Sequence, residues 1–272
     1  MSNLQTRILS ALVLAAVALA ATWAGGVWFA LLAAAAAAAI YFEWASLAAD
    51  VASRAFRSAG AVLVAVPVLL MVFGYPAAHV FGAAAAATLF AFVYALAAEE
   101  GGRVWLAVGY ASVPTAAAAF LRGSDMAGLE AILFLFAVVW ATDIFAYFVG
   151  RAVGGRKLAP SISPGKTLSG AVGGAAAAVV AGVLVAAIFG ARLGLIDIGL
   201  LALGLSVVSQ AGDLFESSVK RRFGVKDSGK LIPGHGGVMD RLDALVAAAA
   251  ALYLVGAALG SPDMPSASLF GG

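Results

Sequence analysis

Residues 217–243 carry side chains that could bind and transfer phosphate groups. The segment reads SSVKRRFGVKDSGKLIPGHGGVMDRLD and combines lysines and arginines with aspartates, one histidine and several glycines. Arg offers bidentate donors to phosphate and Lys a point charge, while glycines let backbone amides approach an anion closely. The segment therefore predicts a site for a substrate with several phosphates. Its candidate ligands are Lys220, Arg221, Arg222, Lys226, Lys230, Arg241 and the glycines Gly236 and Gly237, and His235 could donate to a phosphate or leaving group.

Carboxylates flank these cations at helical spacing. Asp213, Glu216 and Ser217 follow one another at intervals that place them on one helix face, and Asp240 and Asp243 repeat the spacing. Clustered carboxylates repel one another unless a cation lies between them, and Mg²⁺ prefers oxygen ligands together with substrate phosphates. The pattern predicts a Mg²⁺ site. A network of ion pairs at the helix ends is the alternative.

A second polar segment lies between two apolar stretches. Asp143 lies within an apolar run, which makes it a candidate functional residue by default. Gly165-Lys166-Thr167 resembles the end of a phosphate-binding Walker loop, but the earlier glycine that such a loop needs is replaced by Pro160. We therefore expect Lys166 and nearby hydroxyls to face a phosphate at the start of the next helix, with Ser163 or Thr167 as its N-cap.

Other interpretations of these polar residues stay open. A basic cluster can simply hold a protein against anionic lipid, which explains Lys220 to Arg222 well and the carboxylates poorly. For Glu43, a buried hydrogen bond or a lipid contact is as plausible as catalysis.

The composition indicates which elements must position these residues. Hydrophobic residues make up 64% of the 272 residues and charged residues 11%, against about 25% charged in an ordinary soluble domain. We expect an all-α polytopic membrane protein with about nine transmembrane helices.

The absence of cysteine excludes disulfides, thiolate nucleophiles and Cys-ligated zinc. The apolar stretches lie at 8–22, 27–48, 60–73, 77–97, 104–121, 130–149, 168–190, 195–215 and 242–260.

The distribution of cations predicts the orientation. With a cytoplasmic N-terminus, only Arg122 and Arg192 of the 16 lysines and arginines fall on the outer side. The two polar segments then lie in the cytoplasm. We expect two parts, N-terminal transmembrane helices at 1–102 and a catalytic transmembrane domain with cytoplasmic active-site loops at 103–272. Gly173 and Gly174 are candidates for close helix packing.

The polar segments resemble those of a known family, the phosphatidate cytidylyltransferases or CDP-diglyceride synthases. The resemblance rests on the spacing S-x-V-K-R, four residues, K-D-x-G and I-P-x-H-G-G-V-x-D-R-L-D, which residues 217–243 reproduce. It extends to Asp143, Lys157, Pro160, Ser163 and Lys166-Thr167. Ser169 departs from the pattern, because the family usually has Glu there, so this chain has no carboxylate at this position.

The resemblance implies that CTP and phosphatidate react, with Mg²⁺, to give CDP-diacylglycerol and pyrophosphate. It also implies a bacterial inner-membrane location, no nucleic-acid partner and a homodimer. We expect metal ligands at Asp213, Asp240 and, less strongly, Asp143. The other candidates are catalytic Lys166, Lys220, Arg221, His235 and Arg241, and substrate-binding Lys157, Ser163, Thr167, Ser217, Lys226, Asp227, Gly236, Gly237 and Asp243.

Two alternatives to this activity remain. The first is a cytidylyltransferase for another lipid phosphate, such as an archaeal ether lipid. The second is an ion-coupled transporter that uses Asp143, Glu43 and the group around Asp213 as an ion pathway. Transport residues should line several spans near the midplane, whereas these residues are predicted to gather on one cytoplasmic face.

Overall fold

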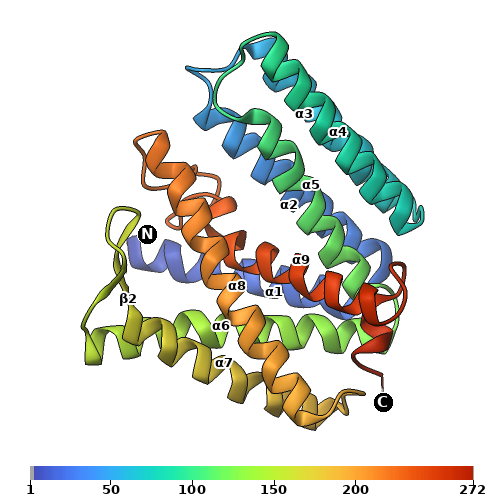
Figure 1. Cartoon of the computed structure of the whole chain (residues 1–272), viewed down its shortest axis with the longest axis vertical. Coiled ribbons are helices and arrows are strands. Elements are labelled where there is room, and N and C mark those ends of the chain that lie inside the picture. The colour runs from blue at the N-terminus through green and yellow to red at the C-terminus, as the bar shows by residue number, and fades with distance from the viewer. Residues whose placement is uncertain (1–2, 272) are drawn as a thin grey trace. The chain divides into compact units, whose positions relative to one another are not determined.

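The computed structural model describes residues 3–271, and within them the fold is helical, as predicted (Figure 1). The described part contains nine α-helices, one short β-hairpin and a 3₁₀ turn. Their bounds are α1 Asn3–Ala24, α2 Gly26–Leu47, α3 Arg54–Val72, α4 Ala77–Ala97, α5 Val104–Arg122, α6 Met126–Val153, β1 Lys157–Ala159, β2 Ser163–Thr167, α7 Leu168–Phe189, α8 Leu195–Arg222, α9 Met239–Leu259 and η1 Pro265–Ser268.

Eight of these helices, α2 to α9, are long and apolar enough to cross a membrane. These helices are 19 to 28 residues long. A helix needs about 20 residues to cross the hydrocarbon core of a bilayer. The apolar part of α1, Ile8–Ala24, is shorter. The protein is therefore a polytopic helical membrane protein.

The chain divides into two compact units. Unit 1 comprises residues 1–120 and 223–241, and unit 2 comprises residues 121–222 and 242–272. The two units are defined by which residues pack together in space. The predicted division into 1–102 and 103–272 is a division along the sequence by function, and it stays a prediction.

Unit 1 is built from α1 to α5 and the loop that precedes α9. Helices α2, α3 and α4 pack in sequence, with α3 between α2 and α4. The buried stripe of α4 consists largely of alanine and recurs every three or four residues, whereas α3 buries larger side chains such as Phe56 and Met71. The loop between α2 and α3 is tied to the loop between α4 and α5, because Glu100 accepts a hydrogen bond from the Ser53 amide at 2.7 Å.

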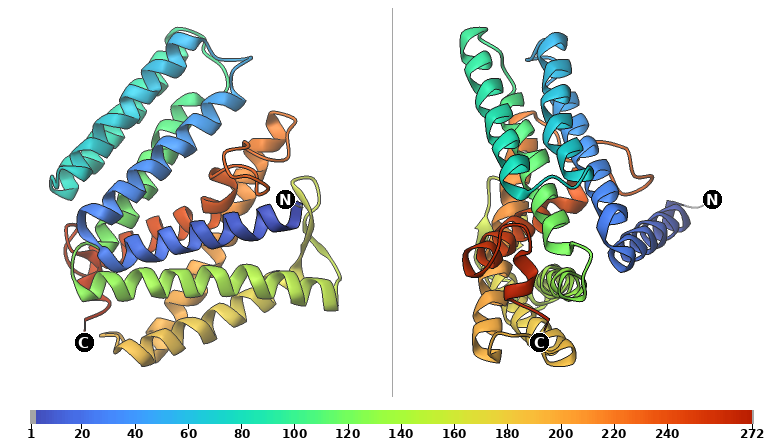
Figure 2. Two further views of the ribbon diagram at one scale, coloured as in Figure 1. Left: turned by 180° about the vertical axis from the view of Figure 1, so that it is seen from behind. Right: turned by 90° about the vertical axis from the view of Figure 1, so that its right-hand side faces the viewer.

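Unit 2 is organised around the close approach of α6 and α7, which lie side by side in both views of Figure 2. The buried face of α7 is a row of small residues at four-residue spacing, namely Gly170, Gly174, Ala178, Gly182 and Ala186. A β-carbon at Gly174 would lie 2.6 Å from the Thr142 carbonyl oxygen of α6. The prediction that Gly174 serves close packing is confirmed, and Gly173 packs beside it against Val149.

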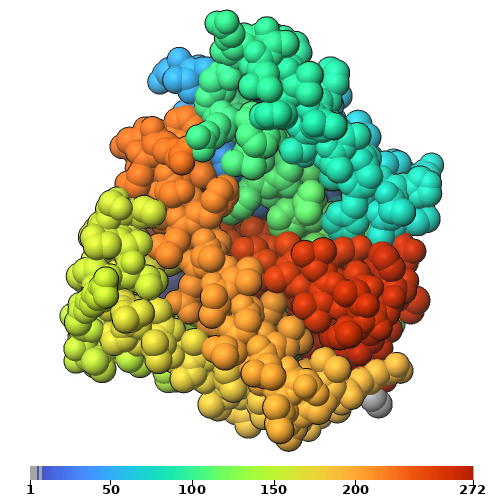
Figure 3. Space-filling model, viewed as in Figure 1, coloured from blue at the N-terminus to red at the C-terminus, as the bar shows by residue number. Residues whose placement is uncertain are grey.

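Two local features add to the elements predicted from the sequence. Helix α8 continues past the apolar stretch 195–215 to Arg222. Glu216 and Ser217 are therefore helical, as their spacing from Asp213 predicts, and Lys220 and Arg221 are helical as well. Residues 157–167, for which no helix or strand was predicted, form the antiparallel hairpin β1–β2, with Lys157 paired to Thr167. In the space-filling view the hairpin and the start of α7, coloured yellow-green to yellow, form one continuous surface (Figure 3).

Candidate active site

Within unit 1, the predicted phosphate-binding loop is held by two carboxylates. Glu43 of α2 is 2% exposed and accepts hydrogen bonds from the Ser228 hydroxyl and from the amides of Val238 and Met239, each at 2.8 Å. Of the interpretations left open for Glu43, the buried hydrogen bond is the one that the structure shows. The signal in the sequence was an acidic residue within an apolar span.

Asp240 holds the same loop from the start of α9. It accepts hydrogen bonds from the Ser228 amide at 3.0 Å and from the Gly237 amide at 2.8 Å. Charge-assisted bonds of this kind are about twice as strong as neutral ones. Glu43 and Asp240 therefore fix both ends of the segment 228–239, and a metal-binding role for Asp240 stays a prediction.

The glycines of this loop allow the two carboxylates to approach it. Gly236 has φ +86°, a backbone conformation that favours glycine. A β-carbon on Gly237 would lie 2.0 Å from the Ser228 hydroxyl and 2.4 Å from a carboxylate oxygen of Glu43. Both predicted glycines are thus required by the fold of the loop, whatever they also do for a substrate.

The polar side chains of the loop lie around this core. Arg241 donates to the His235 carbonyl at 3.0 Å, so its guanidinium braces the turn at 232–236. The Nδ1 atom of His235 is buried and has no hydrogen-bond partner among the described residues. Lys226 and Asp227 are exposed, so both are accessible to a ligand.

Unit 2 contains a pocket of about 580 Å³ at the hairpin end of α6, with several charged residues in its lining. It brings together Asp143 of α6, Lys157 and Lys166 of the hairpin, Thr167, and Asp213 of α8. Five residues that the sequence analysis assigned to phosphate or metal binding therefore line one cavity. Ser163 lies in β2, opposite Ala159.

Lys166 and Asp213 form an ion pair inside this pocket, and both are partly exposed. The Ser217 hydroxyl donates to Asp213 at 3.3 Å, as the four-residue spacing predicts. Thr167 caps α7 by accepting a hydrogen bond from the Gly170 amide at 3.1 Å. The positive end of α7 therefore lies beside Lys166, an arrangement suited to an anion.

Several other site residues of unit 2 have structural partners. Lys220 forms an ion pair at 2.6 Å with Glu216, which is fully buried. Arg221 reaches the hairpin turn, where it donates to the Ile162 carbonyl at 3.3 Å. Asp243 accepts a hydrogen bond from the Ala244 amide at 2.8 Å. The Ser169 hydroxyl donates to the Gly154 carbonyl, so this residue fastens the start of α7 to the end of α6.

No group of three or more His, Cys, Asp or Glu side chains among residues 3–271 is arranged to hold a metal ion by itself. Mg²⁺ does not require such a cage, because it is commonly bound by one or two carboxylates together with substrate phosphates and water. The Asp213 carboxylate, which already faces the Lys166 ammonium, fits that mode of binding.

The fold and these sites define a class: a polytopic membrane protein with a pocket that brings lysines and carboxylates together. Comparison with known proteins identifies the family within that class. The sequence model of the cytidylyltransferase family matches residues 5–259, and the chain belongs to this family.

Individual relatives agree with this assignment. The chain is 50% identical over 272 residues to a protein of Brucella suis biovar 1 named phosphatidate cytidylyltransferase, covering 99% of each chain. It is equally similar to the protein of that name from Brucella melitensis biotype 1. A Bacillus subtilis protein of the same name is 43% identical over 135 residues, half of each chain.

Proposed function

We propose that this protein transfers the cytidylyl group of CTP to phosphatidate, giving CDP-diacylglycerol and pyrophosphate. The observation that carries the proposal is the 50% identity over 99% of both chains to proteins named phosphatidate cytidylyltransferase. The geometry of unit 2 supports it, because Lys157, Lys166 and the start of α7 line one pocket with Asp213.

The reaction is a displacement at phosphorus. An oxygen of the phosphatidate phosphate attacks the α-phosphorus of CTP, the bond from that phosphorus to the bridging oxygen of the β-phosphate breaks, and pyrophosphate leaves with the electron pair. No covalent bond to the enzyme is needed, so catalysis consists of positioning the phosphates and neutralising their charge.

The residues of the pocket suit those two tasks. Lys166 and Lys157 neutralise phosphate oxygens, and the N-terminus of α7, capped by Thr167, offers backbone amides to them. In unit 1, Glu43 and Asp240 hold the loop 228–239 in one conformation, which keeps its exposed lysine, Lys230, available to a phosphate. Partly enclosed donors of this kind typically contribute 10²–10³-fold each to turnover.

Magnesium is proposed as the cofactor, with Asp213 as the carboxylate that would hold it together with substrate phosphates. When bound, the ion would neutralise negative charge on the triphosphate. Asp143 lines the same pocket and is the second candidate ligand.

Purified protein, labelled CTP, Mg²⁺ and phosphatidate in mixed micelles test the proposal. We expect release of pyrophosphate together with CDP-diacylglycerol, and lower turnover for Asp240→Asn, because the amide removes one charged acceptor that holds the loop, at a cost of about 1–3 kcal/mol. Asp50→Asn, an exposed change in the loop between α2 and α3, is the matched control. Equal turnover of Asp240→Asn and the control would refute the assigned role of Asp240. Solute flux in liposomes without pyrophosphate release would instead support a transporter.

The relatives also support a membrane location for this protein, whereas the predicted homodimer stays a prediction. The similar proteins named above come from bacteria, and we propose a bacterial inner membrane for this multi-pass protein. The homodimer expected from the family resemblance can be tested by light scattering in detergent.

A further inference from the structure

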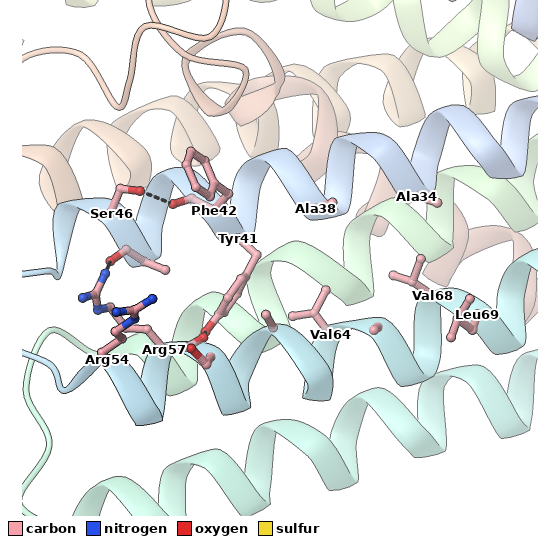
Figure 4. Close-up of a pocket in the computed structure, with 14 residues that line it drawn as sticks. Ala34, Ala38, Tyr41, Phe42, Ser46, Arg54, Arg57, Val64, Val68 and Leu69 are labelled. Carbon is pink, nitrogen blue, oxygen red and sulfur yellow. Dashed lines mark hydrogen bonds between the residues drawn. The ribbon is translucent and has the colours of Figure 1, made fainter.

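A groove of about 640 Å³ lies between α2 and α3, wholly within unit 1 (Figure 4). Every residue that lines it belongs to positions 34–69. None of these residues is used in the reaction proposed above, so the groove is a separate feature of the molecule.

One end of the groove is cationic. Arg54 and Arg57 from the start of α3 meet Ser46 from the end of α2 there (Figure 4). An Nη atom of Arg57 lies 3.5 Å from the Ala45 carbonyl oxygen, whereas its Nε is buried without a hydrogen-bond partner among the described residues. A buried donor without an acceptor is costly. Arg54 is exposed and Arg57 is partly exposed, so both residues remain accessible to a phosphate in the groove.

Tyr41 gives the groove a fixed wall. Its side chain reaches from α2 to α3, where the hydroxyl donates to the Arg57 carbonyl at 2.7 Å (Figure 4). A β-carbon on Gly60 would lie 2.0 Å from that hydroxyl, so glycine at this position leaves room for the ring. The groove is therefore shaped by specific contacts of α2 with α3.

The rest of the groove is apolar. Ala34, Val68 and Leu69 line the end away from the arginines (Figure 4). Phe42 and Leu69 are 60% and 51% exposed, and both lie in helices that can cross a membrane. Exposed apolar side chains on such helices face acyl chains. The groove therefore combines a cationic end, which suits an anion, with an apolar stretch that suits an acyl chain.

We propose that this groove binds an anionic phospholipid, with the phosphate at Arg54 and Arg57 and an acyl chain along α2 and α3. Charge complementarity favours this occupant, because two guanidiniums suit a phosphate. The alternative occupant is an apolar helix of a second copy of the chain, which would leave both guanidiniums without an anionic partner. In the predicted orientation the arginines lie at the cytoplasmic leaflet, whose anionic lipids attract such cations.

Short-chain phosphatidylglycerol is a suitable probe, because it carries an anionic phosphate diester and is not phosphatidate. Its binding to the purified full-length protein in detergent can be measured by native mass spectrometry or by thermal shift. Turnover is not part of the readout, so failure of the proposed reaction would leave this test intact.

Two variants remove different parts of the groove. Arg54→Gln combined with Arg57→Gln removes the charges but keeps the Tyr41 hydrogen bond, which goes to a backbone carbonyl. We expect affinity for phosphatidylglycerol to fall at least about tenfold.

Ala65→Phe fills the groove and should weaken binding similarly. Arg103→Gln and Ala59→Phe, exposed changes outside the groove, are the matched controls and should bind like the unmodified protein.

Three outcomes would overturn the proposal. The first is unchanged affinity in the double arginine variant. The second is equal binding of zwitterionic phosphatidylcholine, or of inorganic phosphate alone, by the unmodified protein. The third is a change of oligomeric state in Ala65→Phe without loss of lipid binding, which would identify the groove as a contact between two copies of the chain.

Discussion

At the residue scale, Glu43 joins helix α2 to a segment about 190 positions further along the chain. Both of its carboxylate oxygens accept hydrogen bonds from the segment 228–239, and the side chain is buried. A buried acceptor with several donors is costly to remove, because each donor loses its partner without regaining water.

Glu43→Gln should therefore impair the enzyme although it changes little in size. Glutamine replaces one acceptor oxygen with an NH₂ group that faces backbone or hydroxyl donors. We expect a stability loss of about 1–3 kcal/mol and lower cytidylyl transfer, measured by thermal unfolding and by pyrophosphate release. The control is Glu99→Gln, an exposed change in the same unit. If Glu43→Gln matched that control in both assays, the loop would not depend on Glu43.

Lys166 allows function to be separated from stability. Its ion pair with Asp213 is partly exposed, and such pairs contribute only about 0–1 kcal/mol. Lys166→Met should therefore leave the unfolding temperature nearly unchanged while it lowers kcat/KM for CTP by roughly 10²-fold. Steady-state kinetics at varied CTP concentration measure this effect. A large stability loss with normal kinetics would show that Lys166 is structural.

At the element scale, the contact of α6 with α7 depends on glycine. Gly174→Ala places a β-carbon 2.6 Å from the Thr142 carbonyl oxygen, so α6 and α7 must move apart. We expect destabilisation of about 1–3 kcal/mol, as for overpacked interiors. Gly204→Ala in α8 has no neighbouring atom within 4 Å, so it should be neutral or slightly stabilising. Thermal unfolding of both variants in one detergent tests the contrast.

The helices were predictable because nearly all of the chain's apolar residues fall in runs of membrane length. The predicted run 77–97 coincides with α4, whereas α8 extends seven residues beyond its apolar part. That extension was not predictable from hydropathy, because its last turns are polar and are held by contacts such as Lys220 with Glu216.

The hairpin β1–β2 and the role of Glu43 show why part of the site could not be predicted. Neither strand has the alternation of apolar and polar residues that signals a half-buried strand, and Pro164 argues against one. The partners of Glu43 follow it by 185 to 196 positions, and no local pattern encodes such a distant contact. By contrast, the pocket residues Asp143, Lys166 and Asp213 were recognisable as polar residues in or beside apolar spans.

At the scale of the whole molecule, the predicted orientation can be tested with single cysteines, because the natural chain has none. Ala98→Cys lies between α4 and α5, and Ser124→Cys lies between α5 and α6. With a cytoplasmic N-terminus and α1 crossing the membrane, an impermeant thiol reagent added to whole cells should label Ser124→Cys and not Ala98→Cys. The reverse pattern would invert the orientation.

The attachment of Glu43 to residues 228–239 also has a consequence for biosynthesis. When α2 leaves the ribosome, the donors that will neutralise its carboxylate have not been translated, and about 185 further residues must follow before Ser228 exists. Until then the newly made helix carries an acid that lacks its final partners in a poorly solvating environment. The loop that precedes α9 therefore supplies the final hydrogen-bond donors to α2, and a chain truncated before Ser228 should be a preferred target for membrane quality-control proteases.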